Sequence, residues 1–184
     1  AEETGLIVPI GSWVVRTAVA EAREWRERTG LDLRLAVNIS SRQFRYRELL
    51  ELLERVVDDS GALPLALELE ITESRVMADP VTATELLKEL KARGFSLAMD
   101  DFGTGDSSLA YLRTFPFDMS KIDQSFIADL GHSDEAGAIV RAMLQLGRAL
   151  GLRIMAEGVE TAAQLAFLEA EGCDEVQGFL CCPP

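Results

Sequence analysis

The sequence is poor in residues that bind soft metals or form disulfide frameworks. It has one histidine and three cysteines among 184 residues. Cys173, Cys181 and Cys182 do not show the spacing of zinc ligands, and two of them are adjacent. We therefore expect reduced thiols and a cytoplasmic protein, and we regard zinc and copper chemistry as poor interpretations.

Long apolar runs and an excess of positive charge are also missing. The apolar stretches are far shorter than the roughly 20 residues of a membrane helix, so we expect no membrane span in this segment. Ala1–Thr4 is acidic where a signal peptide would be basic. The 31 acids exceed the 18 bases, giving a net charge of −13. This balance argues against DNA binding, but it permits a small phosphorylated ligand if metal ions supply positive charge.

Strand-like and helix-like segments alternate along the chain. The clearest helical pattern runs from Ile10 to Trp25 and ends at Thr29-Gly30. The residues that fall on one face of this helix are Ile10, Trp13, Val14, Thr17, Ala18, Ala22 and Trp25. Further helices are expected from Asp79-Pro80 to Gly94, from Ser133 or Asp134 to about Leu150, and from a Thr161–Gln164 capping box to Gly172. Strands are expected at residues 33–40, 66–72, 96–102, 119–123, 153–159 and 175–180.

This alternation predicts one α/β domain, residues 1–184, with a parallel sheet and crossover helices. An open doubly wound sheet and a closed (β/α)8 barrel are the two alternatives. No Gly-x-Gly-x-x-Gly turn follows the first strand, which weakens the dinucleotide-binding form of the open sheet. Residues 65–72 have large apolar side chains at odd positions and small or polar ones at even positions. That pattern favours a barrel, whose strands turn one face toward the helices and the other toward the axis.

The strand count falls short of a complete barrel. We find six strands, whereas a barrel of this type has eight and about 250 residues. The first recognisable element is also a helix. We therefore expect a TIM-like (β/α)8 barrel that lacks its first two strands, with about six strand–helix units present.

Polar side chains occur near the C-terminal end of each expected strand, where barrel active sites are built. They are Asn38, Glu70, Asp100, Asp101, Lys121, Asp123, Glu157 and Gln177. Several carboxylates at one small mouth need protons or a divalent cation, and an oxygen-rich set with one amide suits Mg²⁺ or Mn²⁺. The adjacent pair Asp100-Asp101 indicates two ions, one aspartate bridging them. The Gly-rich residues 101–108 follow directly and are interpreted as a lid or switch.

The same residues carry a family resemblance. The matching stretches cover nearly the whole chain in order and are residues 1–7, 37–40, 70–73, 100–105, 121–123, 156–160 and 177–179. Together they resemble the EAL domain, a bacterial phosphodiesterase that linearises the messenger cyclic di-GMP. The resemblance implies a barrel with one antiparallel strand, two Mg²⁺ or Mn²⁺ ions, and often a homodimer with upstream sensor or cyclase domains.

The resemblance also implies roles for individual residues. The expected metal ligands are Asn38, Glu70, Asp100, Asp101 and Glu157, and the expected catalytic residues are Lys121, which holds the attacking water, and Glu157. Gln177, Asp123 and Glu160 match substrate-binding positions, and Glu73 matches the glutamate that anchors the lid loop.

Three departures from the family pattern stand out. The Glu-Ala-Leu signature is absent, and with it one metal ligand, because its strand would precede Ala1. Asp106 replaces the usual tyrosine of the loop. Cys181-Cys182-Pro183-Pro184 stands where the family usually has Phe-Ser-Arg-Pro, so the expected arginine is lost.

Three hypotheses for the function follow. The first is metal-dependent hydrolysis of cyclic di-GMP to the linear dinucleotide, with reduced activity in this chain because one ligand is missing. The second is a receptor module that binds cyclic di-GMP without cleaving it. The third, a purely structural dimerisation domain, leaves the carboxylates unexplained. Every metal position that lies within the chain is retained, which favours the enzyme for the intact parent protein.

Overall fold

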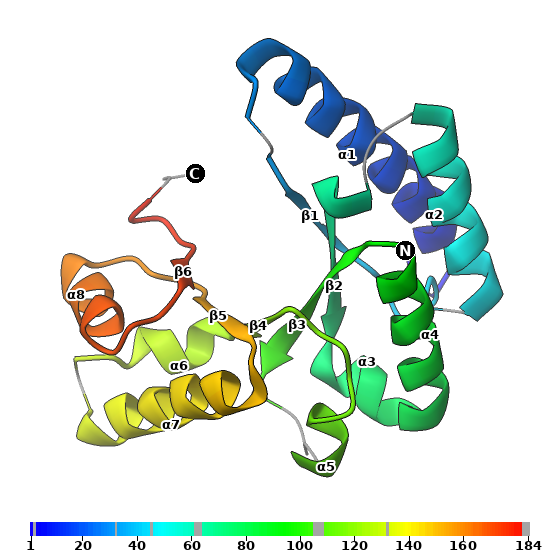
Figure 1. Ribbon diagram of the computed structural model, residues 1–184. Helices are drawn as coiled ribbons and strands as arrows, with labels where there is room; N and C mark the ends of the chain where they lie inside the picture. Colours follow the sequence, from blue (N-terminus) through cyan, green and yellow to red (C-terminus); the bar gives the residue numbers. More distant parts are fainter. Residues whose placement is uncertain are drawn as a thin grey trace. The chain divides into compact units, whose positions relative to one another are not determined.

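Helices and strands alternate along the chain in the computed structural model (Figure 1). The structure describes residues 1, 3–31, 33–44, 46–60, 64–104, 109–131 and 133–181. The chain divides into two compact units. Unit 1 comprises Ala1–Ile71 and Arg75–Leu97, and unit 2 comprises Thr72–Ser74 and Ala98–Pro184.

Unit 1 contains two parallel strands with their helices. Its elements are α1 (Ile7–Thr29), β1 (Leu35–Asn38), α2 (Tyr46–Ser60), a 3-10 turn (Pro64–Ala66), β2 (Leu67–Thr72, except its last residue), most of α3 (Glu73–Ala78) and α4 (Pro80–Ala92). Helix α1 packs against β1 and α2, and α2 packs against α4. In the parallel pair β1–β2, Leu35 lies opposite Leu67 and Asn38 lies opposite Glu70.

Unit 2 contains the remaining strands. Its elements are β3 (Ser96–Phe102, from Ala98 onward), α5 (Leu109–Leu112), β4 (Met119–Ile122), α6 (Gln124–Ala128), α7 (Asp134–Leu150), β5 (Arg153–Ala156), α8 (Ala162–Ala170) and β6 (Glu175–Val176). Strands β3 to β6 pair in parallel with their neighbours. Helix α7 packs against β4, β5 and α6.

The strand order decides between the two alternatives left by the sequence. The described residues form six strands, and their order in the sheet is β1-β2-β3-β4-β5-β6, the same as in the chain. A doubly wound sheet reverses direction at a switch point, whereas a barrel of the TIM type adds each new strand on the same side. The six predicted strands are confirmed, and the order without reversal is that of a TIM-like fold.

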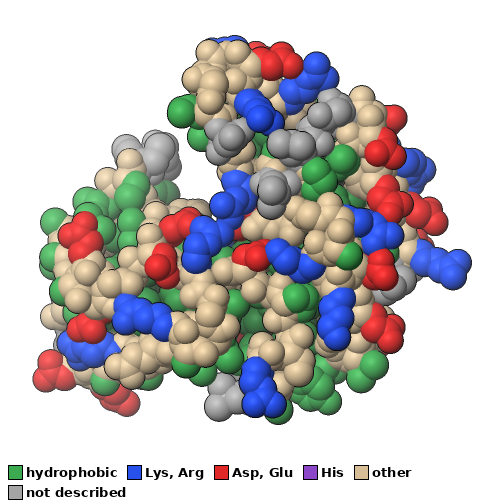
Figure 2. Space-filling model, in the orientation of Figure 1, with side chains coloured by type: hydrophobic (Ala, Val, Ile, Leu, Met, Phe, Trp, Pro, Cys, Tyr) green, Lys and Arg blue, Asp and Glu red, His purple; other side chains and the backbone are tan. Residues whose placement is uncertain are grey.

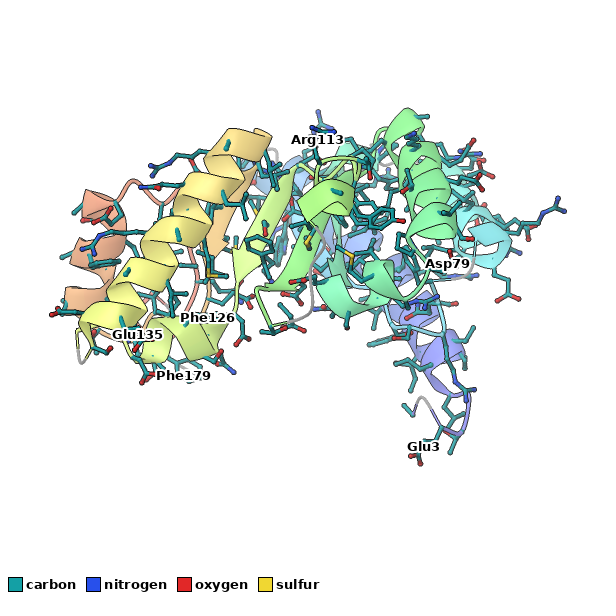
Figure 3. The ribbon with its side chains drawn as sticks, turned by 90° about the horizontal axis from the view of Figure 1, so that it is seen from below. Glu3, Asp79, Arg113, Phe126, Glu135 and Phe179 are labelled. Carbon is teal, nitrogen blue, oxygen red and sulfur yellow. The ribbon has the colours of Figure 1, made fainter. Side chains whose placement is uncertain are left out.

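The predicted helix ends are also confirmed. Asp79, labelled in Figure 3, precedes α4 and accepts a hydrogen bond from the Thr82 backbone N–H. Thr161 and Gln164 form a capping box at the start of α8. Gly30 ends α1 with φ of 70°, a left-handed conformation that side chains disfavour. Ser133 is the N-cap of α7, and Gly151 is its C-cap.

The apolar face that the sequence pattern gives for α1 is not the face that the structure buries, although Ala22 belongs to both. The buried residues of α1 are Gly11, Val15, Val19 and Ala22, whereas Trp13 is 65% exposed. At Gly11 the helix approaches Gln43 closely, and a Cβ atom there would lie 1.9 Å from Nε2 of Gln43. Val15 and Val19 pack inward with Gly11 and Ala22, whereas Ile10, Trp13 and Trp25 are exposed, and the periodicity of the sequence does not reveal this choice.

The strands of the core bury charged side chains as well as apolar ones. All four residues of β4 are buried, including Lys121. In β2, Glu68 is buried and accepts hydrogen bonds from Arg34 Nη1 at 2.8 Å and Ser96 Oγ at 3.0 Å. Burying a carboxylate is costly unless it is paired and hydrogen-bonded, and these two partners satisfy that condition for Glu68.

Acidic and basic side chains are interspersed on the face that Figure 2 shows. Arg93 pairs with Glu54 and Glu89, and Arg141 pairs with Glu171. Exposed pairs of this kind contribute little to stability individually. None of the helices in the described parts of the chain has the length and apolar character needed to cross a membrane.

Candidate functional site

A buried lysine lies among carboxylates in unit 2. Lys121 on β4 is 3% exposed, and its Nζ lies 2.5 Å from Glu157 Oε1 and 3.7 Å from Asp100 Oδ1. The pairing of β4 with β5 brings these groups together, since Lys121 lies opposite Met155. The Glu157 N–H continues this pairing by donating to the Ile122 carbonyl at 3.1 Å. The lysine, Glu157 and Asp100 therefore form one cluster of charges at the ends of three strands.

Asp101 adopts an unusual backbone conformation. Its φ is 57°, and it is the only non-glycine residue with positive φ among the described residues. The pairing of β3 with β4 shifts register between Met99 and Phe102, so Asp101 lies within this irregularity. Strained backbone of this kind concentrates at functional sites, where surrounding structure maintains it.

The electrostatic surroundings of Asp101 favour a cation. Burial raises the pKa of its carboxyl above the usual range, and the negative charges of Asp100 and Asp123 raise it further, while Lys121 acts in the opposite direction. Repulsion among the acids makes the ionised form costly. A bound divalent cation would remove that cost.

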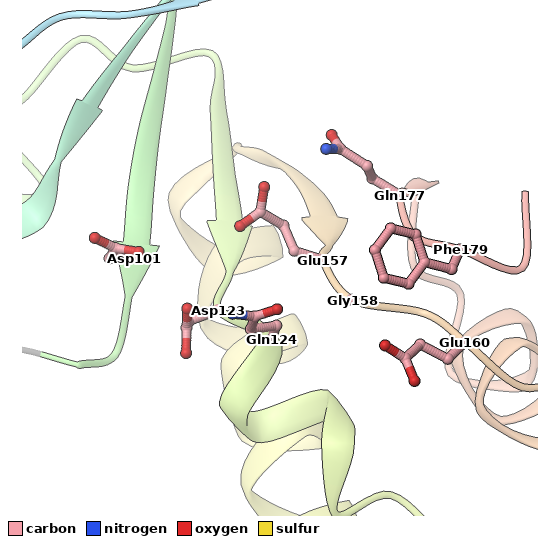
Figure 4. A pocket seen from close by; sticks show the side chains of 9 residues that line it. Asp101, Asp123, Gln124, Glu157, Gly158, Glu160, Gln177 and Phe179 are labelled. Carbon is pink, nitrogen blue, oxygen red and sulfur yellow. The ribbon is translucent and has the colours of Figure 1, made fainter. Parts of the chain in front are cut away.

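A pocket of about 320 Å³ opens next to this cluster. Its lining residues are Asp101, Asp123, Gln124, Glu157, Gly158, Glu160, Gln177, Gly178 and Phe179. Figure 4 shows Gln177, Phe179 and Glu160 on one side of the pocket and Asp101 on the opposite side. The volume falls within the range of small-molecule sites. Five of the predicted site residues therefore line one pocket.

The backbone after β6 shapes one wall of the pocket. The strand expected at residues 175–180 ends at Val176, but the Gln177 N–H still donates to Ala156 O at 2.9 Å. The Val159 N–H then donates to Gln177 O at 3.0 Å. A Cβ atom at Gly178 would lie 2.2 Å from the Val159 carbonyl oxygen, so the two segments approach too closely for any side chain at that position.

Asp123 begins the short helix that follows β4. Its Oδ1 accepts hydrogen bonds from the backbone N–H of Ser125 at 2.9 Å and from the Ser125 hydroxyl. This N-cap fixes the carboxylate at the edge of the pocket.

Two further predicted ligands lie in unit 1. Asn38 Nδ2 donates to Glu70 Oε2 at 2.9 Å, across the pairing of β1 with β2. The amide nitrogen is thereby engaged, so Oδ1 is the atom of Asn38 that could bind a cation. Glu70 is 5% exposed, whereas Asn38 is exposed.

Glu73 contacts the segment that follows β3. Its side chain is fully buried, and its Oε2 accepts a hydrogen bond from the Gly103 N–H at 2.8 Å. Within the described ranges, Oε1 of Glu73 has no hydrogen-bond partner. Burial raises the pKa of this carboxyl; the Gly103 bond opposes the rise, and the charge of Asp101 adds to it. Residues 105–108 of the predicted lid, including Asp106, lie outside the described residues, as do residues 182–184.

The donor set fits a hard divalent cation. Carboxylate and amide oxygens are the ligands that Mg²⁺ and Mn²⁺ prefer. The expected ligands are divided between the units, with Asn38 and Glu70 in unit 1 and Asp100, Asp101 and Glu157 in unit 2. In the part of the chain that the structure describes, no three His, Cys, Asp or Glu side chains form a recognisable metal-binding group. The metal site therefore remains a prediction, supported by the raised pKa of Asp101.

Some pocket residues were not predicted from the sequence. Gln124, Gly158 and Phe179 line the pocket beside the predicted acids. Each is a direct neighbour of a predicted residue or follows one closely, as Phe179 follows Gln177. Their position next to predicted residues could have identified them, because loop residues that adjoin the ends of neighbouring strands border the same pocket.

Comparison with known proteins identifies the family of this chain. The EAL domain model matches residues 1–184. The bifunctional diguanylate cyclase/cyclic di-GMP phosphodiesterase MucR of Pseudomonas aeruginosa is 44% identical over 180 residues, covering 98% of this chain and 26% of that protein. The cyclic di-GMP phosphodiesterase PdeR of Escherichia coli is 39% identical over 184 residues, covering 100% of this chain and 28% of that protein. The chain thus spans about a quarter of the length of these relatives.

A solved structure supports the same assignment. The structure named "PaMucR Phosphodiesterase, c-di-GMP complex" is 44% identical, with a TM-score of 0.95, covering 98% of this chain and 73% of that one. The expected TIM-like α/β fold, present here in part with six parallel strands, is therefore confirmed. With a family model that matches its whole length, the chain belongs to the EAL domain family.

Proposed function

We propose that this chain hydrolyses one phosphodiester bond of cyclic di-GMP to give the linear dinucleotide. The observation that carries the proposal is the Lys121–Glu157–Asp100 cluster beside a pocket of about 320 Å³. Two relatives that are 44% and 39% identical to this chain have names that include cyclic di-GMP phosphodiesterase. A buried ion pair at a pocket edge is a costly arrangement, and such arrangements concentrate at functional sites.

The chain's own residues suit phosphodiester hydrolysis. Lys121 Nζ is an ammonium donor that can hold a water or hydroxide oxygen against the scissile phosphorus. Its contact with Glu157, at 2.5 Å, fixes the direction of the ammonium group. Glu157 is also placed to accept a proton from a water held by the ammonium group of Lys121.

The acidic lining creates a requirement for positive charge. Asp101, Asp123, Glu157 and Glu160 all border the pocket, and the proposed substrate is a dianion. Repulsion between these carboxylates and the substrate phosphates would exclude the substrate unless bound cations neutralise it. In unit 2, Asp100, Asp101 and Glu157 would hold Mg²⁺ or Mn²⁺, which supply Lewis acidity and lower the pKa of water. Asn38 and Glu70 are the ligands expected from unit 1. Gln177, Asp123 and Glu160 would contact the dinucleotide.

The test is direct turnover of cyclic di-GMP by the 184-residue chain with Mg²⁺ or Mn²⁺, followed by chromatography of the products. We expect the linear dinucleotide as product, and about 100-fold less of it from Glu157→Gln. Glu169→Gln, an exposed position on α8, is the matched control and should retain the activity. Absence of turnover together with tight binding would instead identify a receptor that does not cleave its ligand. Absence of both would contradict the proposal.

The setting of this activity is part of the proposal. We expect the domain to act in the cytoplasm as a homodimer, joined to sensor or cyclase domains in the whole protein. The relative MucR, of which this chain covers 26%, is named as both a cyclase and a phosphodiesterase, and this supports the idea of a partner domain.

A further inference from the structure

A glutamine outside the pocket connects two of the segments that form it. Gln164, on the first turn of α8, is 6% exposed and is not one of the residues that line the pocket. Its Oε1 accepts hydrogen bonds from the backbone N–H groups of Glu160 and Thr161, each at 2.9 Å. Its Nε2 donates to the Ile127 carbonyl at 3.0 Å. Burying an amide is costly unless its polar atoms are hydrogen-bonded, and here the oxygen and the nitrogen both are.

The helix cap accounts for only one of these three hydrogen bonds. In the capping box, Gln164 Oε1 accepts from the Thr161 N–H, and the Thr161 hydroxyl accepts from the Gln164 N–H. The bonds to Glu160 and Ile127 are additional, and they join two different segments of unit 2. The Ile127 carbonyl also accepts from the Leu130 N–H at 3.1 Å, so it has a partner without the glutamine. Neither the cap nor this carbonyl therefore requires the additional bonds.

Both of the connected segments carry residues of the pocket. Ile127 belongs to α6, which begins directly after Asp123, and Asp123 and Gln124 line the pocket. Glu160 lies with Glu157 on the segment after β5, and both of these acids line the pocket as well. Figure 4 shows Asp123 and Gln124 at the start of α6 and Glu160 on the neighbouring segment. Since α6 follows β4, the strand of Lys121, the glutamine connects the two parts of the chain that carry Lys121 and Glu157.

The same two segments also meet at the pocket itself. A Cβ atom at Gly158 would lie 2.5 Å from the Cβ of Gln124, so the segment after β5 approaches the start of α6 closely. Gln164 provides a second connection near the other end of α6. A helix of only five residues has few hydrogen bonds of its own, so outside contacts decide its position. Connections at both ends fix the position and the direction of α6 relative to the segment that carries Glu157.

We infer that Gln164 is a positioning residue, which keeps Glu157 aligned with Lys121 by fastening the segment after β5 to α6. The inference rests on the proposed function, because it assumes that Lys121 and Glu157 carry out the hydrolysis. Displacing a reacting group by about 1 Å can reduce turnover about 100-fold, so we expect about tenfold for the smaller shift that loss of this connection permits. The side chain of Glu160 is exposed and can readjust to a ligand, so the loss should appear in kcat rather than in KM.

The test measures turnover of cyclic di-GMP by variants of the 184-residue chain with Mg²⁺ or Mn²⁺. Gln164→Met has a similar size but has neither the amide oxygen nor the amide donor. Gln164→Asn keeps the amide but is one methylene shorter, so it cannot reach both segments. We expect both variants to lower kcat about tenfold and to change KM by less than about twofold. Hydrogen exchange at the Glu160 amide should accelerate about tenfold in both, because its acceptor is lost.

Thr161→Ala is the matched control. Thr161 is exposed, and its hydroxyl supplies the other half of the capping box. Loss of an N-cap lowers stability, so this variant should reduce the urea midpoint. It leaves the bonds of Gln164 to Glu160 and Ile127 in place, so kcat and exchange at the Glu160 amide should remain those of the unaltered chain.

The outcomes separate this inference from the proposed function. If the unaltered chain hydrolyses cyclic di-GMP and the Gln164 variants keep kcat within about twofold, the positioning role is wrong and the proposed function stands. If Thr161→Ala lowers kcat as much as the Gln164 variants do, the stability of α8 explains the loss, and the inference again fails. If the unaltered chain does not hydrolyse cyclic di-GMP, the proposed function is overturned and the inference with it.

Discussion

Lys121 Nζ lies 2.5 Å from Glu157 Oε1, inside a part of unit 2 where the lysine side chain is only 4% exposed. A lysine buried to this extent loses most of its hydration, so its charge depends on nearby carboxylates. Glu157 and Asp100 supply them. Lys121 is thus held beside two carboxylates, one of which, Glu157, lines the pocket, and this arrangement suits phosphate chemistry.

Replacing Lys121 by methionine should reduce turnover of cyclic di-GMP by about 100-fold or more. Methionine has a similar length and can fill the same space, but it has no ammonium group to hold water. Lys88→Met, at an exposed position on α4, is the matched control. Product formation is measured by chromatography, and circular dichroism checks the fold. Turnover within twofold of the unaltered chain would remove Lys121 from the mechanism.

Asp101→Asn should stabilise the metal-free protein and weaken its response to metal. Burial and the neighbouring acids raise the pKa of Asp101, so its charge at neutral pH costs stability. Asparagine removes that charge and tolerates the left-handed backbone found at this position. In EDTA, the urea midpoint should therefore rise. With saturating Mn²⁺ or Mg²⁺, the gain in melting temperature should be roughly halved or lost.

The control for Asp101 is Asp58→Asn, an exposed carboxylate on α2. Asp58→Asn should change neither the urea midpoint in EDTA nor the rise in melting temperature that metal produces. A lower urea midpoint for Asp101→Asn in EDTA would show that the carboxylate stabilises the apo site. If metal raises the melting temperature of Asp101→Asn as much as that of the unaltered chain, Asp101 is not a metal ligand.

Local features of the fold were predictable from the sequence, because they depend on few neighbours. The capping box of Thr161 and Gln164 and the N-cap Asp79 are local hydrogen-bond patterns, and the structure confirms them. The buried face of α1 was not predictable, because Gln43 approaches Gly11 from a distant part of the chain.

In the candidate site, too, local features were predictable from the sequence and long-range contacts were not. The acids and Lys121 could be identified as strand-end residues, and the family resemblance gave them roles. The contact between Lys121 and Glu157 depends on the register of β4 and β5, which places Lys121 opposite Met155. The left-handed φ of Asp101 depends on the irregular pairing of β3 with β4. Long-range pairing of this kind leaves no periodic signal in the sequence.

Glu73 should make stability fall as pH rises through the mildly acidic range. Its pKa in the folded protein is raised by burial, above the usual value of about 4.3. The folded state therefore binds the proton more tightly than the unfolded state, so this contribution is complete at low pH and is lost as pH rises through the folded pKa. In Glu73→Gln, which cannot ionise, that part of the decline in the free energy of unfolding should be absent. Urea titrations from pH 4 to pH 8 measure the difference.

Glu73→Ala tests the contact with Gly103 separately. Loss of the carboxylate removes the acceptor of the Gly103 N–H, so hydrogen exchange at that amide should accelerate about tenfold. Glu85→Ala, at an exposed position on α4, is the control and should leave exchange at Gly103 unchanged. Equal protection at Gly103 in both variants would show that this hydrogen bond does not hold the segment.

Gly178→Ala should disrupt the pocket, although the substitution adds only one methyl group. The added Cβ would lie 2.2 Å from the Val159 carbonyl oxygen and 2.3 Å from the Val159 nitrogen, and neither is the end of a flexible side chain. The backbone must move, and it carries the hydrogen bonds from Gln177 and Leu180 that form the pocket wall. We expect a loss of about 2 to 4 kcal/mol in the free energy of unfolding, together with weaker binding of cyclic di-GMP.

Gly131→Ala separates this clash from ordinary backbone strain. Gly131 has φ of 88°, but no atom lies within 4 Å of an added Cβ there, so the variant should lose only about 1 to 2 kcal/mol. Because Gly131 does not line the pocket, affinity for the dinucleotide should remain that of the unaltered chain. Urea unfolding gives the stabilities, and calorimetric titration gives the affinities. If Gly178→Ala loses no more stability than Gly131→Ala and binds equally well, the close approach to Val159 does not shape the pocket.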